Sequence, residues 1–344
     1  MSRIFKSTFS IALTLFFLFS TSLFALHLWS ARPFQETKPK YIYFTQGTSL
    51  SELAGLLETQ GVVDHGVFFH GWVRFFRDYS KFQAGTYKIH GAMSPQAIAE
   101  KISAGKVHRK VFLQVTIPEG FTLDKTISRL AAKKVGTRRQ LKALSKDAAF
   151  LRSLGLKGMP SLEGFLYPAT YSFYQKPTPR LVYSRMVKNF FKNVSKDLIK
   201  ELKSKKLDLL EATVFASLIE LETQIEDEKP KVAEVIWRRL KRREPLGIDA
   251  SVIYGIKDFD GDLTWEHLAD RKNPYNLRVF RGLPPGPIGS PSLSSFKAIL
   301  NPTDRGYYYY VLIADGNNRH HFSKTLREHN RYVKKLLKAS RSKK

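Results

Sequence analysis

The chain has 344 residues, of which 43% are hydrophobic, with no cysteine and a formal net charge of +27. This hydrophobic content excludes a disordered protein, and the length favours about two domains. The lack of cysteine excludes disulfides, thiol catalysis and cysteine-ligated zinc or iron–sulfur centres. The nine histidines show no metal-ligand spacing on a helix, so we expect neither a metal ion nor a cofactor.

The N-terminal segment is the longest apolar run of the chain. Arg3 and Lys6 precede a stretch from Ser7 to Trp29 that carries no formal charge, and about 20 apolar residues suffice to span a bilayer. The run is long for a signal-peptide core and lacks a clear small-x-small cleavage site, which favours an uncleaved anchor over a cleaved signal. Basic residues at the leading end predict that this end is cytoplasmic. We therefore expect residues 1–32 to be a cytoplasmic tip and a single-pass anchor in the cytoplasmic membrane, with the rest outside.

Lysine and arginine recur in scattered clusters instead of one stripe with interleaved aromatic residues. This scatter, together with an exported location, argues against a nucleic-acid partner. Most clusters are expected to be solvated faces. Weak, salt-sensitive attraction to anionic lipid headgroups or acidic wall polymers accounts for the same charge.

A short linker, residues 33–40, is predicted from two prolines and several charges. The next segment, residues 41–110, predicts a small α+β module. Ser49 and Glu52 form the signature of a capping box, and Ser94 with Pro95 begins a later helix. The expected elements alternate as strand, helix, helix, strand and helix, over residues 41–45, 50–57, 67–76, 84–89 and 96–103.

Two further patterns follow the module. Residues 115–123 repeat the strand, glycine, hydroxyl and leucine order of residues 43–50, which predicts a second strand-turn-helix element. Helical patterns then continue to about residue 154. Residues 163–173 are dense in aromatic side chains around a proline, which is typical of a buried core or, less often, of a sugar-stacking wall.

The segment from Thr213 to Gln224 places a carboxylate on the apolar side of a helix. At helical spacing Glu222 shares a stripe with apolar side chains, whereas Glu220 falls on a polar stripe with Thr213 and Ser217. Apolar surroundings raise the pKa of a carboxyl, so Glu222 could hold a proton near neutral pH as a general acid. The alternative is that Glu222 reaches water at the helix end or pairs with a basic residue. On this pattern Glu220 is the ordinary acid, and its replacement should cost less activity.

The C-terminal part alternates helices with rigid loops. Residues 249–255 begin a loop-rich region, and the proline-rich segments 273–276 and 282–288 predict turns that shape a site. A strand over residues 307–314 should form a hairpin with residues 320–322. Two helices are expected in this part, over residues 232–240 and 325–337.

Several motifs in a fixed order carry a resemblance to a known family. They are G-T-Y, E-G-F-L-Y-P-A-T-Y, A-S-L-I-E-L-E-T, D-A-S-V-I-Y-G, Y-N, G-L-P-P-G-P-I, A-D-G, H-H-F and E-H-N. Behind an N-terminal anchor, this series resembles the endolytic murein transglycosylase (YceG-like) family over nearly the whole chain. The resemblance implies a LysM-like module joined to a domain that cuts peptidoglycan strands internally, with peptidoglycan and the membrane as partners and peptidoglycan synthases as candidate partners.

The family's catalytic glutamate, the second acid of its E-x-E-T motif, falls on Glu222. Such an enzyme would cleave the β-1,4 bond between N-acetylmuramic acid and N-acetylglucosamine. The sugar's own 6-hydroxyl then attacks and leaves 1,6-anhydro-muramyl ends. The resemblance also implies residues that bind substrate or lie beside it: Glu220, Thr223, Asp249, Tyr254, Tyr275 and Asn276.

The chain departs from the family at residues 247–251. It reads G-I-D-A-S where the family often has Q-S-D-P-T or Q-T-D-P-T, so Asp249 is kept while the glutamine and proline are lost. Two other functions stay open: a non-enzymatic envelope scaffold that binds glycan, and a hydrolase that uses Asp249 as a second carboxylate. The expected fold is α+β, with an N-terminal transmembrane helix, a small LysM-like α+β module, a larger mixed α+β catalytic domain at residues 111–340 and a basic tail at residues 341–344.

Overall fold

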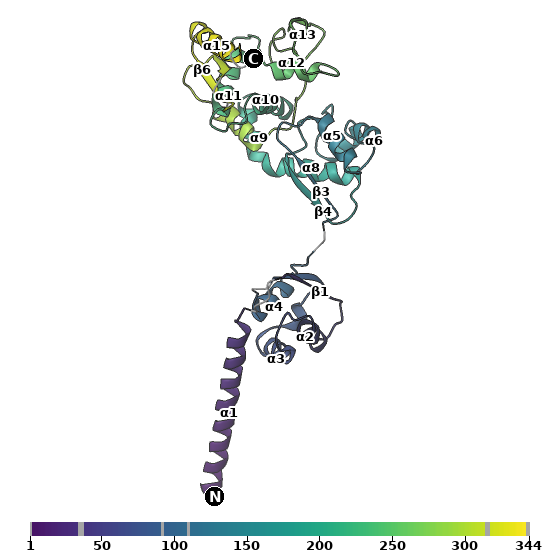
Figure 1. Ribbon diagram of the computed structural model, residues 1–344, viewed down its shortest axis with the longest axis vertical. Helices are drawn as coiled ribbons and strands as arrows, with labels where there is room; N and C mark the ends of the chain where they lie inside the picture. Colours follow the sequence, from purple (N-terminus) through teal and green to yellow (C-terminus); the bar gives the residue numbers. More distant parts are fainter. Residues whose placement is uncertain (1, 34–37, 91–92, 109–110, 314–316, 342–344) are drawn as a thin grey trace. The chain divides into compact units, whose positions relative to one another are not determined.

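The structure is a computed structural model that describes residues 2–33, 38–90, 93–108, 111–313 and 317–341 (Figure 1). The chain divides into two compact units, Met1–Lys110 and Val111–Lys344. Half of the predicted linker, residues 34–37, and most of the predicted basic tail lie outside the described residues. The mixture of helices and sheets confirms the α+β prediction in its coarse form. The likeness of residues 41–110 to LysM stays a prediction.

The first unit begins with a long apolar helix. In α1 (Ser2–Ser30), residues Phe9–Ser30 are long and apolar enough to cross a membrane. We call the elements that follow, from β1 to α4, the N-terminal module. They are β1 (Lys40–Phe44), α2 (Leu50–Thr59), α3 (Gly66–Phe76), a 3-10 turn at Tyr79–Lys81, β2 (Gly85–Ile89) and α4 (Pro95–Ser103). Their order matches the one predicted from sequence.

The module folds around an antiparallel pair. Strands β1 and β2 pair with Ile42 opposite Tyr87, and both side chains are buried. Because alternate residues of a strand face one side, this face packs on the apolar sides of the helices, where Phe69 and Trp72 are fully buried. The predicted capping box of Ser49 is present at the start of α2.

The second unit contains two small sheets and most of the helices. Strand β3 pairs antiparallel with β4, and β5 with β6 as the predicted hairpin. The strands are β3 (Leu113–Ile117), β4 (Ala169–Phe173), β5 (Tyr309–Leu312) and β6 (His320–Ser323). The helices before the site are α5 (Leu123–Ala132), α6 (Arg138–Leu144), α7 (Ala148–Ser153), α8 (Pro179–Asn193) and α9 (Lys196–Ser204). The remaining helices are α10 (Leu209–Glu222), α11 (Lys229–Lys241), α12 (Asp249–Gly255), α13 (Trp265–Ala269), α14 (Leu293–Leu300) and α15 (Leu326–Arg341).

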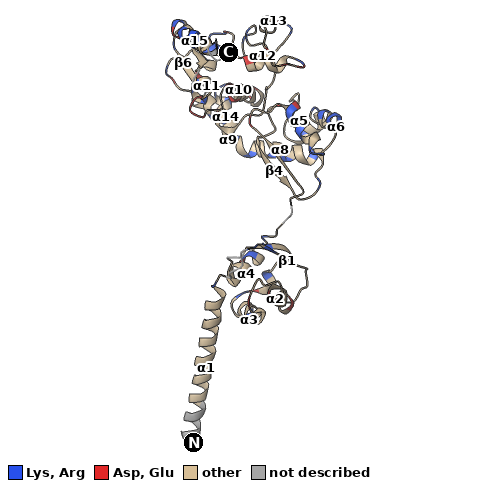
Figure 2. Cartoon of the chain, viewed as in Figure 1, with Lys and Arg blue, Asp and Glu red and all other residues tan. Residues whose placement is uncertain are grey.

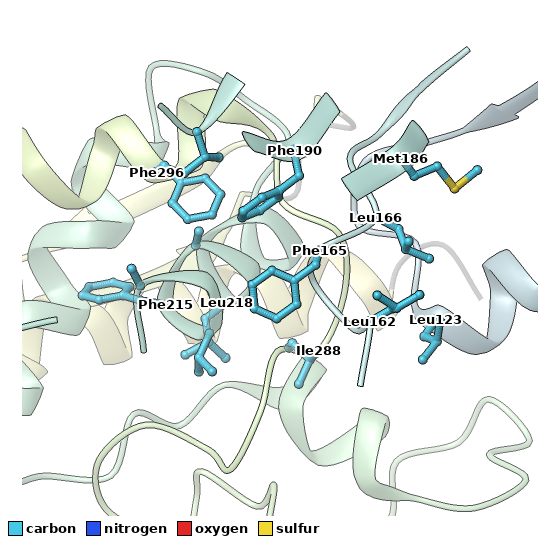
Figure 3. Close-up of a cluster of buried hydrophobic side chains, with 14 of the residues drawn as sticks. Leu123, Leu162, Phe165, Leu166, Met186, Phe190, Phe215, Leu218, Ile288 and Phe296 are labelled. Carbon is cyan, nitrogen blue, oxygen red and sulfur yellow. The ribbon is translucent and has the colours of Figure 1, made fainter. Parts of the chain in front are cut away.

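The central helix of this unit is α10. Every residue from Ala212 to Glu220 is buried, and Phe215 and Leu218 join the cluster drawn in Figure 3 together with Phe165 and Phe296. A helix enclosed on all sides needs no solvent-facing stripe. The expectation that Thr213, Ser217 and Glu220 form an ordinary polar stripe is therefore wrong, because that stripe faces the protein interior.

Two other predictions have clear outcomes. The aromatic run forms core, since Phe165, Tyr171 and Phe173 are buried. The predicted second strand-turn-helix element is confirmed. Helices α2 and α5 each follow a strand and a glycine with positive φ, and each has a hydroxyl side chain at its N-cap, Ser49 or Thr122. One prediction differs, because residues 249–255 form helix α12 and not a loop.

The positive charge is spread over several elements. Figure 2 shows lysine and arginine on α5, α6, α8 and α15 of the second unit, without a single continuous stripe. This distribution fits the expected solvated faces.

Candidate active site

Glu222 is the last residue of α10. The next residue, Thr223, is the C-cap and turns the backbone to an extended conformation at φ −151°. The Glu222 side chain is half-buried, and its Oε2 accepts a hydrogen bond of 2.6 Å from the Tyr310 hydroxyl of β5. The carboxyl is thus fixed between the end of a helix and a strand 88 residues further along the chain.

The surroundings of Glu222 favour its protonated form. Burial raises the pKa of the Glu222 carboxyl above its ordinary value of 4.5, and the charge of Asp249 raises it further. The Tyr310 hydrogen bond, His320 and Arg239 act in the opposite direction. The pKa of Tyr310 is in turn raised well above its ordinary value, first by burial and then by the neighbouring Glu222 charge. Tyr310 therefore stays a hydrogen-bond donor at any physiological pH.

A second carboxylate, Glu228, holds the loop after α10 against β6. Its Oε2 accepts from the Thr223 hydroxyl at 3.0 Å and lies 2.8 Å from Nδ1 of His320, while its Oε1 accepts from the His320 backbone amide at 2.9 Å. The His320 ring also contacts Tyr310 edge-on, with centroids 5.6 Å apart. Thr223 is thus tied to the structure around Glu222 through Glu228 and His320.

Asp249 lies at the first turn of α12 and forms a two-pronged ion pair with Arg278. The distances are 2.5 Å from Nε to Oδ1 and 2.9 Å from Nη2 to Oδ2. Both charges interact electrostatically with Glu222. The Asp249 charge raises the pKa of Glu222, and the Glu222 charge helps to raise the pKa of Arg278. Asp249 is therefore part of the electrostatic environment of Glu222.

Asn276 positions Arg278 from within the protein. The Asn276 side chain is fully buried, donates to the carbonyls of His267, Leu268 and Asp270, and accepts from the Arg278 backbone amide at 3.1 Å. All of these contacts are internal. Asn276 consequently shapes the loop that presents Arg278.

The departure at residues 247–251 makes room for Arg239. Gly247 adopts φ +65°, and a Cβ there would lie 3.2 Å from Nη1 of Arg239. Arg239 donates to the carbonyls of Leu246 at 2.5 Å and Tyr308 at 3.1 Å. The guanidinium is held rigidly, so its positive charge has a fixed effect on Glu222.

Glu220 differs most from its prediction. Its side chain is 1% exposed, as is that of Lys229, which lies 3.3 Å away. Its Oε2 accepts from the amide and hydroxyl of Ser292 at 2.8 and 2.5 Å and from the Ser295 hydroxyl at 2.7 Å. Every contact of this carboxylate is with the protein, so Glu220 joins α10, α11 and the start of α14 and is not the more ordinary, solvated acid.

A separate buried acid, Glu163, holds the predicted tyrosines. Both of its carboxylate oxygens lie 2.9 Å from the Leu123 amide at the start of α5, and Oε2 accepts from the Tyr254 hydroxyl at 2.9 Å. Tyr254 contacts Tyr275 with centroids 4.8 Å apart, and both rings are half-buried. Burial raises the pKa of Glu163 to about 7. Tyr254 and Tyr275 therefore form a pair that is anchored on Glu163.

The sequence did not single out Tyr310, Glu228, His320, Arg278 or Arg239 as site residues. The H-H-F motif and the tyrosine-rich strand were visible, but nothing local links them to a helix end so far along the chain. As for metals, no cluster of three or more His, Asp or Glu side chains suited to an ion occurs within the described part of the chain.

A half-buried carboxyl with a raised pKa, fixed by a tyrosine inside an α+β fold, defines a protein equipped for general acid–base chemistry. Its sequence matches the YceG-like family over residues 42–335, and the chain belongs to that family. The resemblance inferred from the motifs is confirmed.

Individual relatives agree with this assignment. The chain is 30% identical over 319 residues to the endolytic murein transglycosylase of Bacillus subtilis, covering 88% of this chain and 86% of that protein. It is 28% identical over 334 residues to the endolytic murein transglycosylase of Streptococcus pneumoniae, covering 87% of this chain and 60% of that protein. A crystal structure of a YceG-like protein from Listeria monocytogenes, 28% identical, gives a TM-score of 0.57 over 86% of this chain and 99% of that one.

Proposed function

We infer that the chain is an endolytic lytic transglycosylase of peptidoglycan, held in the cytoplasmic membrane by α1 with its second unit outside. It would cut the β-1,4 bond between N-acetylmuramic acid and N-acetylglucosamine within glycan strands and leave 1,6-anhydro-muramyl ends, in a role in cell-wall synthesis or remodelling. The names of the relatives support the substrate class. The observation that carries the chemistry is the Glu222 carboxyl, whose pKa is raised by burial.

Glu222 would act first as the acid and then as the base. Because the Tyr310 hydroxyl donates to Oε2, a protonated Glu222 carries its proton on Oε1, and that proton passes to the departing glycosidic oxygen. The positive centre that develops at the muramyl carbon is then attacked by the sugar's own 6-hydroxyl. Oε1 takes the proton of this hydroxyl, so one carboxyl completes the cycle.

The contacts support different roles for the other candidate residues. Asp249 and Arg278 would set the charge beside the sugar, and the half-buried Tyr254 and Tyr275 could stack on sugar faces. Glu220, Thr223 and Asn276 would be positioning residues, since their side-chain contacts are internal. For the N-terminal module we propose glycan binding.

The hydrolase alternative needs Asp249 as a free second carboxylate. In the structure both Asp249 oxygens are bound by Arg278, which leaves this acid poorly disposed to activate water or to attack the sugar. The arrangement therefore favours the intramolecular route with Glu222 alone.

The test is Glu222→Gln in the full-length protein. The amide keeps the shape of the side chain but cannot transfer a proton, so cleavage of purified peptidoglycan should fall by about 10²-fold to 10⁴-fold while the protein stays folded. A folded Glu222→Gln protein that releases fragments at the native rate would favour the non-enzymatic scaffold.

A further inference from the structure

Helix α3 of the N-terminal module carries an apolar stripe on its outer side. Val67 is 78% exposed, Phe68 47% and Phe75 55%, although the opposite side of the helix is buried in the module core. Val67, Gly71 and Phe75 recur every four residues, so they share a face with Phe68 beside it. Three large exposed apolar side chains on a single helix of eleven residues call for a partner.

This stripe lies against the membrane-spanning candidate helix α1. The Phe68 ring meets Trp29 with centroids 5.6 Å apart, and the Phe75 ring meets Phe19 at 5.9 Å. Between them, a Cβ on Gly71 would lie 3.6 Å from Leu26. The indole nitrogen of Trp29 also donates to Asp64 just before α3, at 3.1 Å. Helix α1 covers only part of the stripe, because the exposed fractions above include its presence.

The contact with Phe19 fixes the depth of α3 in a bilayer. Phe19 lies eleven residues before Ser30, the outer end of the candidate span, which corresponds to about 16 Å along a helix. Phe75 therefore lies level with the middle of the candidate span, whereas Phe68 lies level with its outer end, so α3 runs alongside α1. If Phe75 were in water, Phe24 and Leu28 would be in water too, and residues 9–18 would cover only about 15 Å of a hydrocarbon core of about 30 Å.

We propose that α3 lies alongside α1 in the outer leaflet of the bilayer that α1 spans, with its Val67, Phe68 and Phe75 side chains facing lipid. This inference rests on the proposed membrane anchor. The module is then fixed to the membrane surface by two elements, and any glycan that it binds is held close to the lipid.

Site-specific labelling of the full chain tests this placement. The sequence contains no cysteine, so Val67→Cys gives a single attachment site for a fluorophore. The matched control is Tyr43→Cys on β1, an aromatic position that is 63% exposed on a different element of the module. Leu15→Cys, 61% exposed within α1, reports on the anchor itself. Each variant is reconstituted in vesicles of phosphatidylethanolamine and phosphatidylglycerol, and retained peptidoglycan cleavage confirms folding.

The readout is quenching by lipids that carry a nitroxide. A nitroxide near the headgroup should strongly quench the label at position 67 and leave the label at position 43 at the level of nitroxide-free vesicles. A nitroxide at the middle of the acyl chain should quench the label at position 15. If position 15 is quenched but positions 67 and 43 are equally unaffected, the placement of α3 in the outer leaflet is wrong and the anchor stands. If position 15 is also unaffected, the proposed anchor and this inference are both wrong.

Discussion

Tyr310 donates a hydrogen bond of 2.6 Å to Oε2 of Glu222 and thereby joins the β5–β6 hairpin to the end of α10. A hydrogen bond to an ionised carboxylate stabilises the charged form, so Tyr310 lowers a pKa that burial raises. The balance of these two effects, together with the charges of His320, Asp249 and Arg239, sets the pH at which Glu222 changes from acid to base.

Replacing Tyr310 by Phe should move the alkaline limb of the pH–rate profile to higher pH. Cleavage by a protonated Glu222 is lost as the pH rises through its pKa, and without the Tyr310 hydroxyl that pKa is higher. The maximal rate should also fall, since the carboxyl is less well fixed. Initial rates on purified peptidoglycan across a pH series measure both effects.

Two variants control this result. Tyr309→Phe alters the adjacent tyrosine, which stacks on His329, and should leave the limb in place. Asp249→Asn removes a negative charge that raises the pKa of Glu222, so its limb should move to lower pH. Glu222 would not be the titrating acid if the alkaline limb moved equally in Tyr309→Phe and Tyr310→Phe. The same conclusion would follow if the limb of Asp249→Asn moved to higher pH.

Glu220→Gln should destabilise the protein much more than Glu222→Gln. Removing one partner of a buried ion pair typically costs about 3–5 kcal/mol, and the Glu220–Lys229 pair is 1% exposed on both sides. Lys229 keeps its ion pair with Glu226 at 2.9 Å, so part of its charge stays compensated. Among the residues that the structure describes, Glu222 forms no ion pair, and its raised pKa already favours the neutral form. The free energy of unfolding from denaturant titration measures the difference.

The double variant Glu220→Gln with Lys229→Met serves as the control for Glu220. It removes both charges, so its free energy of unfolding should lie above the value expected from adding the two single losses. If Glu220→Gln unfolds at the same denaturant concentration as the native protein, the buried network does not have the structural role assigned to it.

Glu163 should make stability depend on pH near neutrality. Its pKa rises from 4.5 to about 7 in the folded protein. The contribution of Glu163 to the free energy of unfolding is therefore fully present below pH 4.5 and is lost as the pH rises through about 7. A shift of about 2.5 units corresponds to about 3 kcal/mol. Between pH 5 and pH 8, Glu163→Gln should therefore lose less stability than the native protein.

Denaturant unfolding at both pH values tests the role of Glu163, with exposed Glu201→Gln as the control. The Glu201 variant should follow the native protein. A Glu163→Gln protein with the native pH dependence would mean that another group is responsible.

Local patterns predicted much of the secondary structure. Ser49, Ser94 and Thr122 each accept a hydrogen bond from the first turn of a helix, so those helix starts could be predicted from a few neighbouring residues. The hairpin of β5 and β6 and the order of elements in the N-terminal module followed from alternation and turn residues in the same way.

The environment of the acids could not be predicted from these patterns. In α10 the apolar and polar stripes are both buried, so periodicity could not tell that Glu220 faces Lys229 and not solvent. The contacts that define the site are also distant in sequence. Glu222 meets Tyr310 across 88 residues, and Glu163 meets Tyr254 across 91. Such contacts depend on how complete elements pack, which no local spacing encodes.

The most direct test of the central claim is digestion of purified peptidoglycan by the full-length protein in ¹⁸O-labelled water, followed by mass spectrometry. If Glu222 alone serves as acid and base, the sugar's own 6-hydroxyl attacks, at effective concentrations that reach roughly 10⁵ M or more in well-oriented systems. New ends should then be unlabelled 1,6-anhydro-muramyl groups, and mid-length fragments should precede any disaccharide. Muramyl ends that carry ¹⁸O, with no anhydro product, would show that water attacks and would contradict the account.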